Sequence, residues 1–266
     1  MTTTIAIAGK GGTGKTTLGG LLIKALRDRG AGPILAIDAD PASNLNIVLG
    51  LPLERTVGDI REDTSEKARA NALDPGIAKQ DLLDYEINAS MVESEGVDLL
   101  AMGRPEGPGC YCAANNMLRT IIDRISSSYE YVIIDNEAGL EHLSRRTTRD
   151  VDVLLIVSDP SLRGLTTAGR IVALIDELKT KVGEHYLLIN RVEGPLSAEV
   201  EQAVAARGLN LLATLPADPA IADLDARGAP IIDLPTDNIV STIMDEVLAR
   251  ILPEPLPKET LHADHR

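Results

Sequence analysis

A glycine-rich segment near the start of the chain restricts the fold more than any other feature. It lies between the apolar run Ile5–Ala8 and the stretch Leu18–Leu26, and it reads Gly9-Lys10-Gly11-Gly12-Thr13-Gly14-Lys15-Thr16-Thr17. The apolar run predicts a buried strand and the stretch predicts a helix, which is the context that the pattern G-x-x-x-x-G-K-[ST] requires. Glycines let successive backbone N–H groups surround a phosphate, and the helix N-terminus adds the positive end of its dipole. The segment therefore predicts a site for a nucleoside triphosphate.

Two side chains of this segment have predicted roles in that site. In the pattern, the lysine reaches the β- and γ-phosphates, and the hydroxyl residue holds Mg²⁺. These residues are Lys15 and Thr16 here. The alternative is a glycine turn that binds nothing.

Seven short apolar runs predict strands. Several are continuous Val, Ile and Leu runs, as expected for parallel strands that are covered on both faces. Amphipathic stretches lie between them, and in Leu118–Ile125 the apolar residues recur with the spacing of one helix face. This alternation predicts an α/β fold with a doubly wound, mostly parallel sheet that binds ligands at the carboxyl ends of its strands. The predicted strands are Thr4–Ala8, Ile34–Asp38, Val97–Met102, Tyr131–Asp135, Val153–Val157, Tyr186–Asn190 and Leu211–Leu215.

Composition excludes several classes of function. The 266 residues include no Phe or Trp and only five Tyr, so a stacking platform for single-stranded nucleic acid is excluded. The net charge of −14 opposes nonspecific binding to DNA or to anionic lipid. No run approaches the roughly 18 apolar residues of a membrane span, and no leader segment opens the chain. We therefore expect no nucleic-acid or membrane partner. Two cysteines do not form a disulfide framework, so we expect a location in the reducing cytoplasm.

The chain is predicted to form one nucleotide-binding domain over residues 1–252. Residues 56–95 are polar and rich in Asp, Glu, Lys and Ala, which predicts a helical excursion between two strands. Residues 253–266 contain three prolines and two histidines and are expected to form a flexible tail.

Acidic residues follow two of the predicted strands. Asp38 and Asp40 come at the end of the second strand, and Asp135 ends the strand Tyr131–Asp135. Parallel strands carry their carboxyl ends to one edge of the sheet, beside the phosphate segment, so these carboxylates are placed for Mg²⁺ and water. For Asp38 and Asp40, the alternative is a solvated pair of aspartates at the end of a strand.

The extra lysine at position 10 resembles a feature of one ATPase family. Gly-Lys-Gly-Gly-x-Gly-Lys-Thr is similar to the deviant Walker A motif of dimeric ATPases that include the nitrogenase iron protein, the arsenite pump ATPase, septum-positioning and plasmid-partition ATPases, and metal-insertion factors. The resemblance implies a homodimer in which Lys10 reaches the partner's phosphates, so that Lys10, Lys15 and Asp40 form the catalytic set. The alternative is that Lys10 is a solvated charge on a loop.

The same resemblance assigns the other polar positions. Asp40 would position the attacking water, Asp38 would support Mg²⁺ from the outer shell, and Asp135 would hold Mg²⁺ through water. The Gly139 backbone N–H would sense the γ-phosphate and release Leu140–Arg146 after hydrolysis. The base would be contacted by Asn190 and by the loop residues Pro216, Ala217 and Asp218, although these short segments also suit ordinary strand-to-loop transitions.

Both cysteines of the chain lie in one C-x-C segment, as Cys110 and Cys112. One chain supplies two sulfurs, whereas closed sites for soft metals contain four ligands. A two-fold dimer with this segment on its axis would form a Cys₄ site for Ni²⁺ or Zn²⁺. The alternative is a pair of inert or incidentally redox-active thiols.

The segments Gly103–Cys112 and Asp135–Arg146 resemble the CooC type of ATPase, which inserts nickel during maturation of carbon monoxide dehydrogenase. This resemblance covers nearly the whole chain apart from the tail and implies a metallochaperone. Thr13 stands where the family often has Val. Relatives that serve acetyl-CoA synthase share the motifs, so the client enzyme stays open.

Two other functions remain as alternatives. An electron-transfer ATPase would hold an iron–sulfur cluster between the subunits, but in the nitrogenase iron protein the ligands come from two separated positions. A spatial-organising ATPase that binds membrane needs a basic amphipathic C-terminal helix, whereas Ile239–Leu252 carries Asp245 and Glu246.

Overall fold

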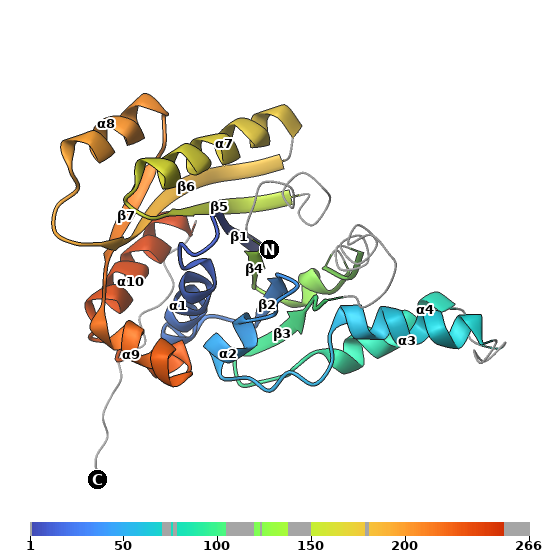
Figure 1. The fold of residues 1–266 in the computed structure, drawn as a ribbon. Coiled ribbons are helices and arrows are strands. Elements are labelled where there is room, and N and C mark those ends of the chain that lie inside the picture. Colours follow the sequence, from blue (N-terminus) through green and yellow to red (C-terminus); the bar gives the residue numbers. More distant parts are fainter. Residues whose placement is uncertain are drawn as a thin grey trace, which may run out of the picture.

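The computed structural model describes residues 2–70, 76, 79–104, 120–122, 124–137, 150–178 and 181–252. These residues form a seven-stranded sheet in the order β3-β2-β4-β1-β5-β6-β7, and every neighbouring pair of strands is parallel (Figure 1). The predicted α/β fold is confirmed. The strands are β1 (Thr3–Gly9), β2 (Ile34–Ala39), β3 (Val97–Ala101), β4 (Tyr131–Asn136), β5 (Asp150–Ser158), β6 (Lys181–Val192) and β7 (Leu211–Pro216).

Helices cover both faces of the sheet, because successive side chains of each strand point to opposite sides. Ile5 and Ile7 of β1 pack in one core, together with residues of α1 and α10, while Ala6 and Ala8 pack in the other, with residues of α7 and α8. The helices are α1 (Lys15–Asp28), α2 (Leu45–Leu49), α3 (Val57–Arg69), α4 (Lys79–Ser90), α7 (Leu162–Leu178), α8 (Ala198–Ala206), α9 (Pro219–Arg227) and α10 (Ile239–Ile251), with 3-10 turns η1 (Ser126–Ser128) and η2 (Ile231–Asp233).

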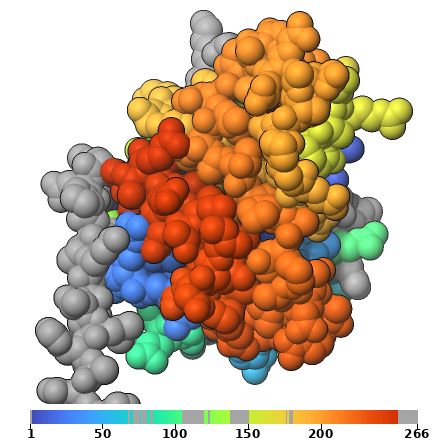
Figure 2. Space-filling model, turned by 90° about the vertical axis from the view of Figure 1, so that its left-hand side faces the viewer, coloured from blue at the N-terminus to red at the C-terminus, as the bar shows by residue number. Residues whose placement is uncertain are grey.

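The C-terminal helix α10 is an integral part of the first core. Its residues Val240, Met244 and Leu248 are at most 1% exposed. The guanidinium of Arg29, which follows α1, donates to the carboxylate and the carbonyl of Asp245 over 3.0 and 2.6 Å. Figure 2 shows the face of the molecule on which the C-terminal segments, in orange and red, form most of the surface.

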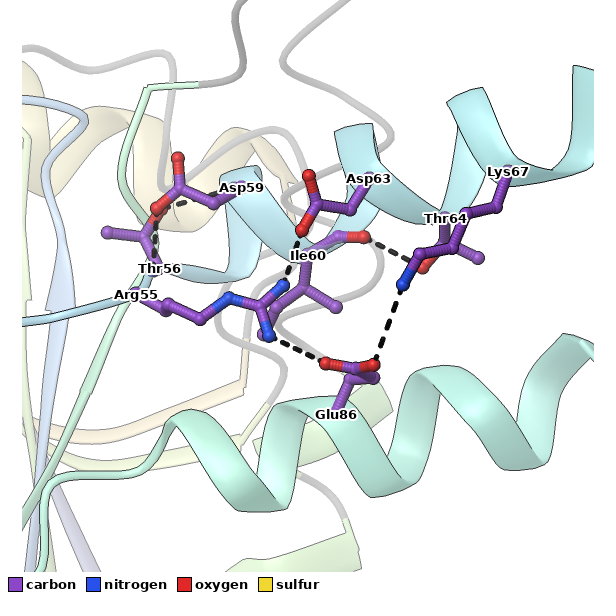
Figure 3. A network of polar contacts seen from close by, with 8 residues as sticks. All are labelled: Arg55, Thr56, Asp59, Ile60, Asp63, Thr64, Lys67 and Glu86. Atoms are coloured by element: carbon purple, nitrogen blue, oxygen red, sulfur yellow. Dashed lines mark hydrogen bonds and ion pairs between the residues drawn. The ribbon is translucent and has the colours of Figure 1, made fainter. Parts of the chain in front are cut away.

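The predicted excursion between β2 and β3 contains α3 and α4, which run side by side away from the sheet (Figure 1). A polar network joins the two helices near their attachment to the sheet (Figure 3). Arg55 donates to Asp63 of α3 and to Glu86 of α4, each over 2.6 Å, and Lys67 lies 3.9 Å from the same Glu86 carboxylate. Glu86 of α4 therefore contacts both Arg55, which precedes α3, and Lys67 of α3.

The start of α3 is also connected to the nucleotide-binding edge of the sheet. The N–H of Met102, just after β3, donates to the carbonyl of Asp38, and the N–H of Gly58 in α3 donates to the carbonyl of Met102, both over 2.8 Å. Thr56 caps α3 by accepting from the Asp59 N–H and donating to its carboxylate. The excursion is thus fixed to the strand end that carries Asp38.

Two further predictions concern segments that the structure describes only partly. Residues 120–122 and 124–125 of the predicted helix Leu118–Ile125 are helical. The cysteine segment and the proposed tail lie outside the described residues, so these predictions stay untested. In the part of the chain that the structure describes, no helix is long and apolar enough to span a membrane.

Candidate nucleotide-binding site

The glycine-rich segment connects β1 to α1 at the carboxyl edge of the sheet, as its sequence context predicts. A Cβ atom on Gly9 would lie 2.2 Å from the carbonyl oxygen of Val157 in β5, so only glycine allows the loop to leave the sheet here. The loop then folds onto its own backbone. The carbonyl of Lys10 accepts hydrogen bonds from the Thr13 hydroxyl over 2.8 Å and from the Thr13 N–H over 3.4 Å.

The side chain of Lys15 lies inside the site. It is 7% exposed, and its ammonium donates to the Lys10 carbonyl over 3.5 Å. Burial lowers the pKa of Lys15, while nearby carboxylates oppose that shift. These carboxylates belong to Asp135, Asp40 and Glu137. The amine therefore stands among acidic groups, where it is available to the phosphates of a bound nucleotide.

Asp38 and Asp135 lie directly opposite each other on β2 and β4. Alternation along the strands puts them on the same face as Ala36 and Ile133, which belong to the core beneath α1. Each residue is 1% exposed. The sheet therefore buries two neighbouring carboxylates at the edge where β1 enters the phosphate loop.

The Asp38 carboxylate organises the loop that follows β2. One oxygen accepts from the Asp40 N–H over 3.0 Å and the other accepts from the Leu45 N–H, at the start of α2, over 2.9 Å. These bonds favour the ionised form, but burial dominates and raises the pKa of Asp38 to about 6. The Asp38 carboxylate therefore holds the backbone of Asp40 in place.

Asp135 has a different environment. Among the described residues, neither of its carboxylate oxygens has a hydrogen-bond partner of good geometry, although the nearby Thr16 hydroxyl lowers its pKa. Burial is the larger effect and raises the pKa of Asp135 to about 7. A buried carboxylate with open ligand positions beside a hydroxyl is a donor set that fits Mg²⁺, a hard cation with oxygen ligands.

Asp40 is half-buried on the loop between β2 and α2. Its carboxylate accepts from the Ala42 N–H over 2.8 Å and lies close enough to Lys15 to raise the pKa of the amine. The structure thus brings Asp40 to the phosphate loop. Its role toward water stays a prediction.

The predicted base-contacting residues lie on β6, at the end of β7 and directly after β7. The amide nitrogen of Asn190 donates to the Thr13 carbonyl over 2.9 Å, so this side chain touches the phosphate loop itself. The Asp218 carboxylate caps α9 by accepting from the Ala220 and Ile221 N–H groups, and its second oxygen accepts from Asn238 over 3.1 Å. Asp218 therefore shapes the loop after Pro216 and Ala217, and its contact with a base stays a prediction.

Lys10 is exposed on the phosphate loop, and its contact with a partner chain stays a prediction. Gly139, Cys110 and Cys112 lie outside the described residues. Within the described part of the chain, no cluster of three or more His, Cys, Asp or Glu side chains is arranged to hold a metal ion.

Sequence reasoning did not single out three residues that the structure brings to this site. The charge of Glu137, two positions after Asp135, raises the pKa of Lys15. Asn136 is 2% exposed and its amide donates to the Ile7 carbonyl over 3.0 Å, which joins β4 to the end of β1. Arg191 donates to the Gly12 carbonyl over 3.2 Å. Asn136 and Glu137 lie in the motif segment Asp135–Arg146, and Arg191 follows the predicted base contact Asn190, but the sequence pattern assigns no role to any of the three.

The fold and the site together define a P-loop nucleotide-binding protein. Residues 4–231 match the family described as the CobQ/CobB/MinD/ParA nucleotide binding domain, and the chain belongs to this family.

Similar proteins agree with this family. The chain is 46% identical to an uncharacterized ATP-binding protein of Methanocaldococcus jannaschii, over 93% of this chain and 98% of that protein. It is 35% identical to the carbon monoxide dehydrogenase accessory protein CooC of Rhodospirillum rubrum, over 86% and 89% of the two chains. The structure resembles the septum site-determining protein MinD of Pyrococcus horikoshii in complex with Mg-ADP, with a TM-score of 0.69, 22% identity, and coverage of 94% and 96%.

The two buried carboxyls predict a pH-dependent stability in the chain free of nucleotide and metal. Their pKa values rise from 3.8 to about 6 and about 7 on folding, so the stability they contribute is complete below about pH 4 and is lost as pH rises through 6 to 7. At about 1.4 kcal/mol per pKa unit, Asp135 accounts for a few kcal/mol. Urea unfolding from pH 4 to pH 8, with a chelator present, measures this loss.

The Asp135→Asn variant is expected to be more stable than wild type at pH 8, with the difference shrinking toward pH 4. The exposed Asp237 provides a matched control, because Asp237→Asn removes a charge without removing a buried one. If Asp135→Asn follows the wild-type pH profile, the carboxyl does not carry a buried charge at pH 8.

Proposed function

We propose that this chain hydrolyses ATP as a cytoplasmic homodimer and uses the cycle to insert nickel into carbon monoxide dehydrogenase or a related nickel enzyme. The observation that carries the ATPase part is the buried pair Asp38 and Asp135 beside the phosphate loop and Lys15. The similarity to CooC over most of both chains supports the maturation role.

In the proposed reaction the protein positions the nucleophile and stabilises charge. Lys15 binds the β- and γ-phosphates, and Asp40 orients the attacking water. Lys10 contributes its charge to the partner's phosphates, so the complete site forms only when two chains meet. Its exposure on the loop supports this role.

The residues Thr16 and Asp135 would hold Mg²⁺, with Asp38 behind them in the outer shell. Bound there, the ion would neutralise part of the phosphate charge. The open oxygens of Asp135 support this assignment, since burial outweighs the nearby charge of Lys15 and raises the pKa of this carboxyl group.

Nickel is the proposed cargo, held by Cys110 and Cys112 from each of two chains. The strand that leads into the cysteine segment is connected to the nucleotide site, because the Met102 N–H donates to the Asp38 carbonyl. A change at the end of β2 would therefore reach the start of that segment directly. This contact supports a coupling between ATP and the metal.

A spatial-organising ATPase is the second candidate, because MinD proteins share this fold. The apolar side of α10 argues against membrane attachment through that helix: Val240, Met244 and Leu248 are buried in the core that includes α1. Nothing among the described residues favours an electron-transfer cluster over nickel transfer.

The first test concerns hydrolysis. Asp40→Asn is expected to bind Mg-ATP with nearly wild-type affinity but to turn it over at least about tenfold more slowly, because positioning of the water is lost while the phosphate cradle remains. Lys15→Ala should instead weaken nucleotide binding itself. Asp237→Asn is the matched control and should behave as wild type. Wild-type turnover by Asp40→Asn would remove Asp40 from the mechanism.

The second test concerns the cargo. If two chains share one ion, Ni²⁺ or Zn²⁺ should bind at about one ion per two chains and should cause dimerisation without ATP. Binding should also release protons as thiols become thiolates. Equilibrium dialysis combined with sedimentation measures both properties. One ion per chain, or undiminished binding by Cys112→Ser, would contradict a shared site.

The third test concerns Lys10. Shifting a dimer from mostly open to mostly closed takes about 5.5 kcal/mol of differential binding. Two symmetric charged hydrogen bonds at about 1.5–3 kcal/mol each supply about 3–6 kcal/mol. Lys10→Ala should therefore lose dimerisation induced by a nonhydrolysable ATP analogue and most ATPase activity, while still binding nucleotide and still dimerising with metal.

Light scattering with and without metal separates these two routes to the dimer. Arg227→Ala, which removes an exposed positive charge of α9, serves as the control. Analogue-induced dimerisation of Lys10→Ala at the wild-type level would show that Lys10 is only a solvated loop charge.

A further inference from the structure

Arg191 has an unusual backbone conformation at the end of β6. Its φ is +57°, and among the described non-glycine residues only Ser43 shares a positive φ. The pairing between β6 and β7 shifts register between Ile189 and Val192, so the strand is distorted at this point. The Asn190 side-chain oxygen accepts the Arg191 N–H over 2.9 Å and thereby stabilises the turn. The distortion is therefore built from these two neighbouring residues.

This turn directs two consecutive side chains onto two consecutive carbonyls of the phosphate loop. Asn190 donates from Nδ2 to the Thr13 carbonyl over 2.9 Å, and Arg191 donates from Nη1 to the Gly12 carbonyl over 3.2 Å. The approach is close: a Cβ atom on Gly14, whose φ is +89°, would lie 2.5 Å from Asn190 Nδ2. Gly14 thus permits the contact as well as the loop turn.

We propose that Asn190 and Arg191 act as a clamp that sets the orientation of the phosphate-loop peptides before nucleotide binds. Because a peptide unit is planar and trans, an oxygen held on one side fixes the N–H on the other. The Gly12 oxygen fixes the N–H of Thr13, which donates to the Lys10 carbonyl over 3.4 Å, and the Thr13 oxygen fixes the N–H of Gly14, the one of the two that is left for phosphate. Both are positioning residues, and Arg191 is the one to which the nucleotide-site motifs assign no role. The clamp rests on the proposed function, since the ligand it prepares for is the phosphate chain of a nucleotide.

The clamp also connects the predicted base-binding part of the site to the phosphate loop. The Asn190 amide donates to the loop and accepts from Arg191, which leaves one N–H and one lone pair for a base. The residue predicted to contact the base therefore also holds the phosphate loop. Base and phosphate binding are coupled through one side chain, with Arg191 supporting its orientation.

Hydrogen exchange in the nucleotide-free full chain tests the clamp directly. Arg191→Asn is suitable because Asn accepts a positive φ while its short side chain lacks the guanidinium that reaches Gly12. Exchange of the loop amides 11–15 should rise about tenfold, the change expected for loss of one charge-assisted hydrogen bond. Arg191→Lys should restore part of the protection, and Arg227→Ala, which removes an exposed arginine of α9, should leave the loop unchanged.

Binding of Mg-ATP and of Mg-tripolyphosphate by the same variants provides the second measurement. Arg191→Asn should weaken both by a similar factor of about ten, because the loss belongs to the phosphate cradle. If Arg191→Asn binds these ligands more weakly but its loop amides exchange as in wild type, Arg191 contacts phosphate directly. If neither ligand binding nor amide exchange changes, Arg191 is a solvated arginine. Either result overturns the clamp. If wild type binds neither ligand, the proposed function fails, while the exchange measurement still decides the clamp.

Discussion

The burial of Asp38 and Asp135 on adjacent strands is the interaction on which the rest of the site depends. Burial makes each of these carboxylates beneath α1 costly to ionise and so raises the pKa of both, and the charge of Asp38 adds to the shift at Asp135. Asp38 offsets part of this cost with two backbone N–H groups, and Lys15 supplies the nearest positive charge. Asp135 keeps its oxygens open among the described residues. The Mg²⁺ ion bound with a nucleotide would add positive charge beside Asp135, so ligand binding and local stability are linked.

The same part of the sheet also connects the nucleotide site to the helical excursion. The Asp38 carbonyl accepts from Met102, and the Met102 carbonyl accepts from Gly58, so β2, β3 and the start of α3 are joined by backbone hydrogen bonds. The polar network around Glu86 then holds α4 against α3. A nucleotide-dependent movement of Asp38 would be transmitted to the helical excursion and to the strand before the cysteine segment, which is the coupling that the proposed function needs.

Much of the fold could be predicted from the sequence, because strands buried on both faces must be continuous aliphatic runs. All seven predicted strands are present, but β6 begins at Lys181, five residues before its apolar run, since an exposed polar strand start has no hydrophobic signal. The phosphate loop and the acidic strand ends were predicted from motifs. The contact of Arg191 with the loop was not, because it depends on a positive φ and on β6 lying beside β5, which are tertiary properties.

The central claim, that burial keeps the pKa of Asp135 raised until nucleotide and metal arrive, is tested most directly by carbon-13 NMR of aspartate carboxyl groups. Loss of a resonance in Asp135→Asn assigns the signal. In the nucleotide-free protein the account predicts a titration midpoint of about 7, and with saturating Mg-ADP it predicts that the carboxyl stays ionised well below that pH. A midpoint near the ordinary value of 3.8 in the nucleotide-free protein, or a midpoint that Mg-ADP does not move, would contradict the account.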